Sequence, residues 1–303
     1  MAPYPLNRLD DLVGETIERA VRAHHVRRLR RHGSARAVDP ASDGWAGTAS
    51  FAPRAGCSVV PFVDGSQALP RIADAVRSAR SHVHLAGWHF DPSFRFEEEG
   101  PTLRELLADA AGRVDVRVLA WAGAPLPLFH PDRREVRRAR DELAEGTRIS
   151  MALDARERPL HCHHEKLVVV DDEVAFVGGI DLTSLAGDRL DSNDHPPRDG
   201  LGWHDTAVRL VGPVVADVAR HFLMRWRATE DGNVPEPSEP AALGDGIETQ
   251  FVRTVPARLY EPCRDGEWSI LESYLGALRA AERLVYLESQ FLWSPEVTFV
   301  LAG

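Results

Sequence analysis

Short apolar segments alternate with amphipathic ones through the middle of the chain. Runs rich in valine and leucine, such as 82–90 (HVHLAGWHF) and 114–121, have the length and composition of buried strands. Between them, segments 102–111 and 132–145 place apolar residues at helical spacing. Strands that alternate with helices predict an α/β layered fold. The other expected strands are 58–63, 147–153, 164–170, 174–180 and 204–211, and the other expected helices are 68–80 and 213–227.

The start of the chain has a different pattern. Residues 9–31 predict an amphipathic helix, and residues 33–56, rich in Gly, Ala and Ser, predict an irregular connector. The arginines of the expected helix have two interpretations, contact with an anionic lipid surface or a solvated basic face, and the pattern favours the solvated face. These arginines are Arg27, Arg28, Arg30 and Arg31.

A strand–helix–strand pattern recurs near the end of the chain. Aligning Val83 with Val285 places the second copy 202 residues after the first. Self-similarity at this separation predicts a duplicated domain rather than a solenoid. The second copy comprises strand 249–255, helix 269–283 and strand 284–292. The expected domains are an N-terminal helix and connector at 1–50, a full first half at 51–230, a Pro- and Gly-rich linker at 231–246, and an incomplete second half at 247–303.

Composition narrows the class of protein. Hydrophobic residues at 44% and charged residues at 27% are ordinary for a soluble globule with a sizeable core. The net charge of -10 argues against a nucleic-acid-binding polycation. The sequence shows neither a secretory signal pattern nor an apolar run long enough to cross a bilayer, so we expect a cytoplasmic protein. The three cysteines, Cys57, Cys162 and Cys263, are too few and too far apart for a disulfide framework.

The basic residues are unevenly divided, because Lys166 is the single lysine among 36. The preference for arginine is typical of a GC-rich genome, yet this one position keeps lysine. Lys166 belongs to the stretch 161–183, HCHHEKLVVVDDEVAFVGGIDLT. On a strand His164 and Lys166 share a face, and after a turn Gly178 and Gly179 allow another backbone to approach closely.

Two other interpretations of this stretch have less support. His161, Cys162 and His163 suggest a zinc site, but neighbours on a strand point to opposite faces and no second Cys/His pair follows at finger spacing. The second interpretation is a surface hairpin whose histidine has no chemical role. Neither accounts for His-x-Lys, then Asp after four residues, then Gly-Gly.

This motif resembles that of the phospholipase D superfamily, and the resemblance covers most of 58–303. It implies a mixed β-sheet flanked by helices on both faces, in a duplicated domain whose second half is incomplete here. Ser289 stands where the family usually has Asn. Further landmarks are LAGWHFDP at 85–92 with Trp88, GGIDL at 178–182, Trp203-His204-Asp205, GPVVADVARHFLMRW at 212–226, QFVRTVP at 250–256 and YLESQF at 286–291.

The resemblance also implies roles for particular residues. His164 is expected to attack phosphorus and form a phosphohistidine, while Lys166 holds the non-bridging oxygens as a compact cation. Asp171 lies seven positions after His164 and is expected to support the hairpin through hydrogen bonds. Asp205 is expected to orient a catalytic imidazole. No metal or other cofactor is expected, because His and Lys meet the phosphate charge.

The family works with two such motifs, and the second histidine acts as general acid and then base. The 202-residue offset places a second motif near position 366, beyond Gly303, and the chain has no second lysine. We therefore expect a truncated chain that is weak or inactive alone. A second chain, identical or not, that supplies the missing motif is an expected partner, although the half-built second domain makes self-association less attractive.

The function expected from the resemblance is phospholipase D-type hydrolysis of a glycerophospholipid, with transfer to alcohols as a variant. The expected partners are a phospholipid substrate and a peripheral membrane surface, without nucleic acid. A nuclease of the same superfamily is a second interpretation, disfavoured by the charge of -10. Cardiolipin-synthase-like transfer and a non-catalytic lipid- or phosphate-binding fragment are the remaining alternatives.

Overall fold

The chain forms two compact units in the computed structural model, and each is described by itself. One unit is Arg54–Thr249, and the other combines Met1–Pro53 with Gln250–Gly303. The domain limits expected from the sequence stay a prediction. The structure describes residues 5–31, 33, 37, 44–97, 99–126, 128–158, 161–183, 204–230, 234–289 and 291–302. Trp203 and Gln290, which belong to two of the landmarks above, lie outside these ranges.

The unit Arg54–Thr249 is built on an eight-stranded mixed sheet with strand order β4-β3-β2-β5-β6-β7-β1-β8. β2, β3 and β4 pair in parallel, and the other neighbours pair antiparallel. The mixed α/β fold expected from the sequence is confirmed. The strands are β1 (Arg54–Val63), β2 (His82–Gly87), β3 (Asp115–Trp121), β4 (Ser150–Asp154), β5 (Leu167–Val170), β6 (Val174–Gly178), β7 (Thr206–Val211) and β8 (Ile247–Thr249).

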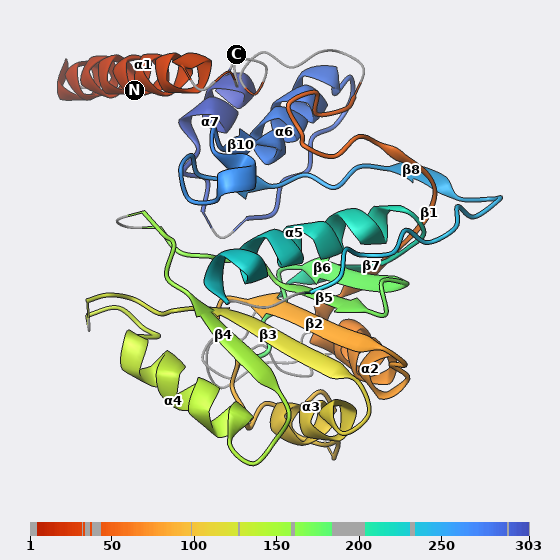
Figure 1. The fold of residues 1–303 in the computed structure, drawn as a ribbon. Coiled ribbons are helices and arrows are strands. Elements are labelled where there is room, and N and C mark those ends of the chain that lie inside the picture. Colours follow the sequence, from red (N-terminus) through yellow and green to blue (C-terminus); the bar gives the residue numbers. More distant parts are fainter. Residues whose placement is uncertain are drawn as a thin grey trace. The chain divides into compact units, whose positions relative to one another are not determined.

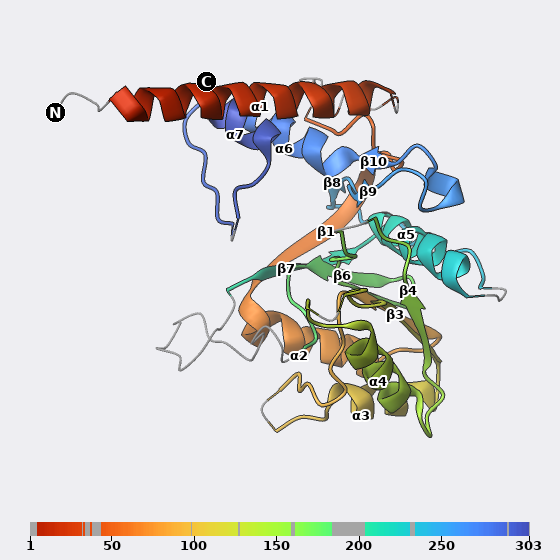
Figure 2. The same ribbon diagram turned by 90° about the vertical axis from the view of Figure 1, so that its left-hand side faces the viewer.

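Helices cover both faces of this sheet (Figure 1). α2 (Asp64–Arg77), α3 (Leu103–Ala111) and α4 (Arg133–Ala144) lie on one face, and α5 (Val214–Thr229) lies on the other (Figure 2). Capping boxes start two of them, Thr102 with Glu105 at α3 and Asp132 with Glu135 at α4. The predicted helices are therefore present, with ends that differ by a few residues.

Alternation along the strands divides the core between the two faces. Val83 and Leu85 of β2, both fully buried, belong to the hydrophobic cluster under α2, α3 and α4. His84, between them, faces the other way and stacks on Phe222 of α5 with ring centroids 4.6 Å apart. The strand is therefore buried on both sides, with His84 on the face that meets α5.

The second unit brings the two ends of the chain together. The carboxylate of Glu272 accepts hydrogen bonds from the backbone N–H of Gly47 and Thr48, at 3.0 and 2.8 Å. α1 contacts α7, with the Arg22 guanidinium 3.5 Å from the ring centre of Phe299 (Figure 2). The elements are α1 (Pro5–Arg31), β9 (Thr254–Val255), a short 3-10 helix (Glu261–Cys263), β10 (Glu267–Trp268), α6 (Ser269–Ala280) and α7 (Pro295–Ala302).

The expected strand at 284–292 is wrong. Its described residues form no strand, and Val285 and Leu287 are about two-fifths exposed, whereas their counterparts Val83 and Leu85 are fully buried. A strand needs neighbours that take its backbone hydrogen bonds. Within the described part of this unit the paired strands are β9 and β10, two residues each, and neither reaches this segment.

Several expected strands have limits that differ from the observed ones. The expected strand 249–255 is split, because β8 ends at Thr249 and β9 begins at Thr254. The expected strand 204–211 begins at Thr206, and the one at 164–170 begins only at Leu167. Across the ranges that the structure describes, no helix is both long enough and apolar enough to cross a membrane.

Candidate active site

The His-x-Lys pair lies immediately before β5, at one edge of the central sheet. β5 runs antiparallel to β2, with Leu167 opposite Ala86, so the pair lies where the parallel strands β2, β3 and β4 end. The extended chain brings the two side chains into contact. Nζ of Lys166 is 3.1 Å from Nδ1 of His164 and 3.1 Å from its carbonyl oxygen.

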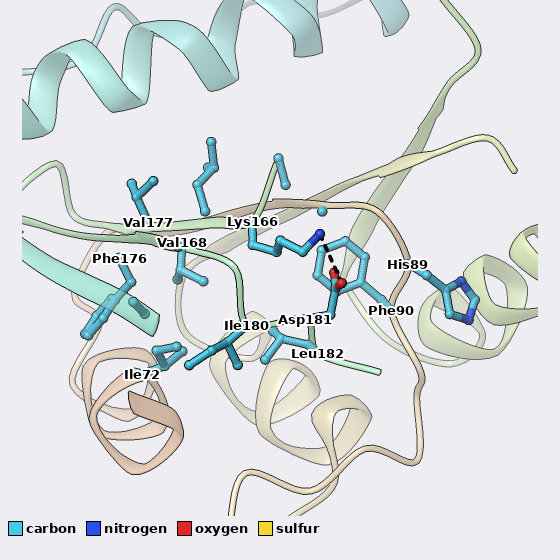
Figure 3. Close-up of a pocket in the computed structure, with 15 residues that line it drawn as sticks. Ile72, His89, Phe90, Lys166, Val168, Phe176, Val177, Ile180, Asp181 and Leu182 are labelled. Carbon is cyan, nitrogen blue, oxygen red and sulfur yellow. Dashed lines mark ion pairs between the residues drawn. The ribbon is translucent and has the colours of Figure 1, made fainter. Parts of the chain in front are cut away.

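Asp181 completes a contact chain that the sequence analysis missed. Its Oδ2 is 3.0 Å from Nζ of Lys166, which donates to it (Figure 3). The carboxylate is almost fully buried, and this burial raises its pKa to about 6, although the Lys166 charge opposes the rise. The available signal was the acid in GGIDL, three residues after the strand β6 that returns from the motif.

Beneath Lys166 and Asp181 is a small, mainly apolar cavity of about 30 Å³. Ile72, Phe90 and Phe176 are among its walls, and the ion pair forms its polar side (Figure 3). A cavity of this size holds about one water molecule. The cavity is therefore too small to hold a substrate. A substrate has to approach Lys166 from the solvent side, where His164 is exposed.

The imidazole of His164 is neutral at physiological pH. Partial burial of the ring, together with the smaller effect of the Lys166 charge, lowers its pKa to about 4. The ring of Trp88 lies against it, with centroids 5.6 Å apart and planes tilted by 52°. A neutral imidazole has a ring nitrogen with a free lone pair, which is the form required of a nucleophile.

The neighbouring His163 and Cys162 have other environments. His163 lies 3.6 Å from the buried carboxylate of Asp154, and burial lowers its pKa to about 4. Cys162 is exposed to solvent as a residue, but partial desolvation of its thiol raises the pKa of that group. Within the described residues no three metal-binding side chains gather in one place, in this stretch or elsewhere.

Glu165, between the two motif residues, points to helix α5. Its carboxylate forms an ion pair with Arg225 and a 2.6 Å hydrogen bond with Nε2 of His221. Nε and Nη2 of Arg225 also donate to Oδ2 of Asp154, both at 3.0 Å. These contacts attach the motif backbone to α5 and β4. The signal available in the sequence was the Arg in FLMRW, which the analysis used only as a landmark.

Asp171 lies at the opposite end of β5 from Lys166. Its carboxylate accepts hydrogen bonds from the backbone N–H of Arg80, Ser81 and His82, at 2.9, 2.8 and 3.0 Å. It therefore binds the junction between α2 and β2. The structure brings His164, Lys166 and Trp88 together and does not bring Asp171 to them.

Gly178 and Gly179 bring β6 and the start of β7 very close. The N–H of Gly178 donates to the carbonyl of Lys166 at 3.3 Å, and a Cβ on this glycine would lie 2.4 Å from the carbonyl oxygen of Thr206. A Cβ on Gly179 would lie 2.0 Å from Oδ1 of Asp205. At Gly178 the obstacle is the backbone of the neighbouring strand, whereas at Gly179 it is the side chain of Asp205, so Gly178 in particular allows the close approach of the two strands.

Asp205 is placed at this same junction. Its Oδ1 accepts the N–H of Thr206 at 2.8 Å, and its own N–H donates to Asp64. Nδ1 of the preceding His204 forms a 2.7 Å hydrogen bond with Asp64, which is itself buried. Across the described part of the site, no hydrogen bond joins Asp205 to His164, so its expected role in orienting an imidazole stays a prediction.

Comparisons with known proteins show which sequences and structures the chain resembles. No family model matches the chain. The chain is 25% identical over 232 residues to phospholipase D C of Dictyostelium discoideum, an alignment that covers 63% of this chain and 14% of that protein. It is 27% identical over 227 residues to phospholipase D zeta 1 of Arabidopsis thaliana, covering 60% and 20%. The chain thus spans about a fifth or less of these relatives.

Two further comparisons add a cardiolipin synthase and a solved structure to these relatives. Over 245 residues the chain is 25% identical to the major cardiolipin synthase ClsA of Bacillus subtilis, covering 77% of this chain and 46% of that protein. Among solved structures, Nuc from Salmonella typhimurium, a phospholipase D family member, aligns with a TM-score of 0.41 and 16% identity, over 59% of this chain and 99% of that one. Given the paired His164 and Lys166 before β5 and the sequence similarity to the phospholipases D named above, the chain belongs to the phospholipase D superfamily.

Proposed function

We propose that the chain cleaves the head-group phosphodiester of a glycerophospholipid, with His164 as nucleophile. The observation that carries this proposal is the contact chain His164–Lys166–Asp181. It places a neutral imidazole within 3.1 Å of an ammonium whose own position is fixed by a buried carboxylate. A phosphate bound between the ring and Nζ would meet a nucleophile and a cation at once.

In the proposed first step a ring nitrogen of His164 bonds to phosphorus, and the bond from phosphorus to the head-group oxygen breaks. The alcohol leaves with a proton, and the phosphatidyl group stays on the histidine. Water then forms a new P–O bond, the P–N bond breaks, and phosphatidate is released. Lys166 donates to the non-bridging oxygens throughout and stabilises the charge that builds up on them.

The leaving alcohol needs a general acid. In the family resemblance this acid is the histidine of a second motif, and the sequence carries one His-x-Lys pair, at His164 and Lys166. We therefore propose that full turnover of an ordinary phospholipid uses a second motif in addition to this one. A substrate whose leaving group needs no proton should react with this chain by itself.

A lipid substrate fits the chain better than a nucleic acid. The net charge of -10 disfavours a polyanion, and the relatives named above include phospholipases D and a cardiolipin synthase. The match to the synthase also favours a transfer variant, because a phosphohistidine can be attacked by an alcohol in place of water. The two outcomes share the first step and differ only in the acceptor.

The experiment is a burst assay with phosphatidyl-p-nitrophenol, whose nitrophenolate leaves without protonation. We expect about one nitrophenolate per chain and an acid-labile phosphatidyl adduct on the tryptic peptide that contains His164. His164→Ala should abolish both signals, while the matched control His161→Ala, an exposed neighbour, should keep them. A burst that survives in His164→Ala would refute the proposal. Faster cleavage of a DNA oligonucleotide than of the lipid would favour the nuclease interpretation.

A further inference from the structure

The loop between β3 and α4 exposes a group of apolar side chains. Leu126, Leu128 and Phe129 are 59, 80 and 53% exposed. Residues 122–129 contain no charged side chain, although about a quarter of the whole chain is charged. Single exposed apolar residues are common on soluble proteins, but three on one loop tip are unusual and indicate an interaction site. The three residues are called the apolar tip below.

The base of this loop is closed by backbone contacts. The N–H of Ala124 donates to the carbonyl of Pro131 at 2.9 Å, and the N–H of Phe129 donates to the carbonyl of Leu126 at 3.2 Å. Gly123 adopts a φ of +84°, and a Cβ there would lie 2.6 Å from the carbonyl oxygen of Asp132. Leu126 and Phe129 are therefore joined to each other and the base of the loop is closed, which lowers the entropy lost when the loop meets a partner.

Exposed arginines follow the tip on the first turns of α4. Arg134, Arg137 and Arg138 are exposed and form no ion pair with any residue that the structure describes. Apolar side chains beside unpaired cations are the chemistry of a membrane surface, where apolar groups enter the acyl boundary and arginines meet lipid phosphates. A protein partner would need one matching apolar and acidic surface, whereas an anionic bilayer offers both features everywhere.

This surface lies at the same edge of the sheet as the candidate active site. β3 and β4 end at the same edge of the sheet as the His-x-Lys pair, and the chain leaves both strands there (Figure 1). Nη2 of Arg133, the first residue of α4, lies 3.0 Å from Oε1 of Glu157, in the segment that leads from β4 to the motif. Trp121, the last residue of β3, donates to the same carboxylate at 3.3 Å.

We propose that the apolar tip and the arginines of α4 dock the chain on a bilayer that contains anionic phospholipid, with the sheet edge of Lys166 facing the lipid head groups. This inference rests on the proposed function, because it assigns that site a substrate presented in a membrane. It places the lipid contact on this loop and not on the arginines of α1, for which the sequence favoured a solvated face.

The test is co-sedimentation of the full chain with phosphatidylcholine vesicles, with and without phosphatidylglycerol. Burying one leucine is worth roughly a tenfold or larger change in partitioning, so Leu128→Asp should lower binding to the anionic vesicles by at least about tenfold. Arg137→Glu/Arg138→Glu should lower it at low salt. The matched controls are Leu243→Ser, an exposed apolar residue elsewhere in the same unit, and Arg148→Glu in the connection between α4 and β4. Both controls should bind like the unmodified chain.

A second measurement separates this inference from the proposed function. Cleavage of bis(p-nitrophenyl) phosphate, a water-soluble diester, should be the same in Leu128→Asp and in the unmodified chain. Vesicle binding unaffected by Leu128→Asp would overturn the docking surface even if the diester is cleaved. A dimer in light scattering that Leu128→Asp disperses, without vesicle binding, would also overturn it and assign the tip to a second copy. Loss of vesicle binding in Leu128→Asp by a chain that cleaves no diester would support the surface and contradict the proposed chemistry.

Discussion

The carboxylate of Glu165 is ion-paired with the guanidinium of Arg225, so the residue between the two motif side chains is attached to helix α5. Alternation along the extended chain explains this arrangement, because His164 and Lys166 point to one side and Glu165 to the other. Arg225 is 1% exposed and also binds the fully buried Asp154. The guanidinium of Arg225 thus bridges the carboxylates of Glu165 and Asp154 and attaches the motif to helix α5.

We expect Arg225→Ala to lower the free energy of unfolding by about 3–5 kcal/mol, because it leaves the buried carboxylate of Asp154 without its cation. Urea denaturation followed by circular dichroism measures the change. Arg140→Ala is the control, since its ion pair with Asp141 lies at the surface and is worth less than about 1 kcal/mol. A loss as small in Arg225→Ala as in the control would show that the bridge carries little of the stability.

Asp181 and His164 predict an unusual pH dependence for the nitrophenolate burst. Asp181, with a pKa raised to about 6, loses its charge as the pH falls through that value and then no longer holds Lys166 as an ion pair. His164, with a pKa of about 4, is still neutral there. The burst rate should therefore fall as the pH drops through about 6. This decline reports protonation of the Asp181 carboxylate, while the His164 nucleophile is still neutral.

The matched variant is Asp181→Asn, which keeps the shape and cannot ionise. It should react more slowly at pH 7, and its rate should stay level down to about pH 5. The measurement is the burst rate between about pH 4.5 and 7.5 for both proteins, a range that spans both groups. If the decline near pH 6 persists in Asp181→Asn, it belongs to another group.

Asp171 is predicted to matter for stability and not for chemistry. Asp171→Ala removes the acceptor of three backbone N–H groups and places alanine at a φ of +56°, so it should cost about 1–3 kcal/mol. Asp171→Asn should cost less, because asparagine tolerates this φ and keeps a side-chain oxygen. Glu173→Ala is the control, since Glu173 is exposed and its described contact is with Arg80 alone.

The readout for Asp171 combines two measurements. Urea denaturation gives the free energy of unfolding, and the burst amplitude at a temperature well below the transition gives the fraction of competent chains. We expect Asp171→Ala to keep the burst rate of the folded protein within about threefold, a difference smaller than 1 kcal/mol. A rate that falls a hundredfold in a protein that remains folded would place Asp171 in the chemistry.

The sequence pattern predicted the elements of the unit Arg54–Thr249 because most strands there have neighbours on both sides, while β4 and β8 lie at the edges of the sheet. Burial on two faces makes a strand nearly all apolar, as in β5, and such a run can be recognised from the sequence. Residues 284–292 carry the same kind of run and form no strand. The apolar pattern records what a segment can bury, whereas strand formation depends on partners that the pattern does not show.

The site was predicted in part for a related reason. His164 and Lys166 are two residues apart, so local geometry brings them together and spacing identifies them. Asp181 reaches Lys166 only through the register of β5 against β6, and Arg225 reaches Glu165 only through the packing of α5 on the sheet. Both are long-range relationships that periodicity does not encode.

The single lysine offers the sharpest remaining test. Nζ of Lys166 lies within 3.1 Å of a ring nitrogen, a carbonyl oxygen and a carboxylate oxygen, and the side chain is 9% exposed. An ammonium donates in three directions from one small centre, whereas a guanidinium is planar and larger. Lys166→Arg keeps the charge, yet it should slow the burst by about 10²-fold or more, the cost of one misplaced donor at a developing charge.

The same change should alter the free energy of unfolding by little, because the apolar stem and the charge are both kept. Arg134→Lys, the reverse exchange at an exposed position, is the matched control and should leave the burst unchanged. A burst in Lys166→Arg within about threefold of the unmodified rate would mean that charge alone suffices at this position. The one lysine among 36 basic residues would then have no chemical explanation in the proposed mechanism.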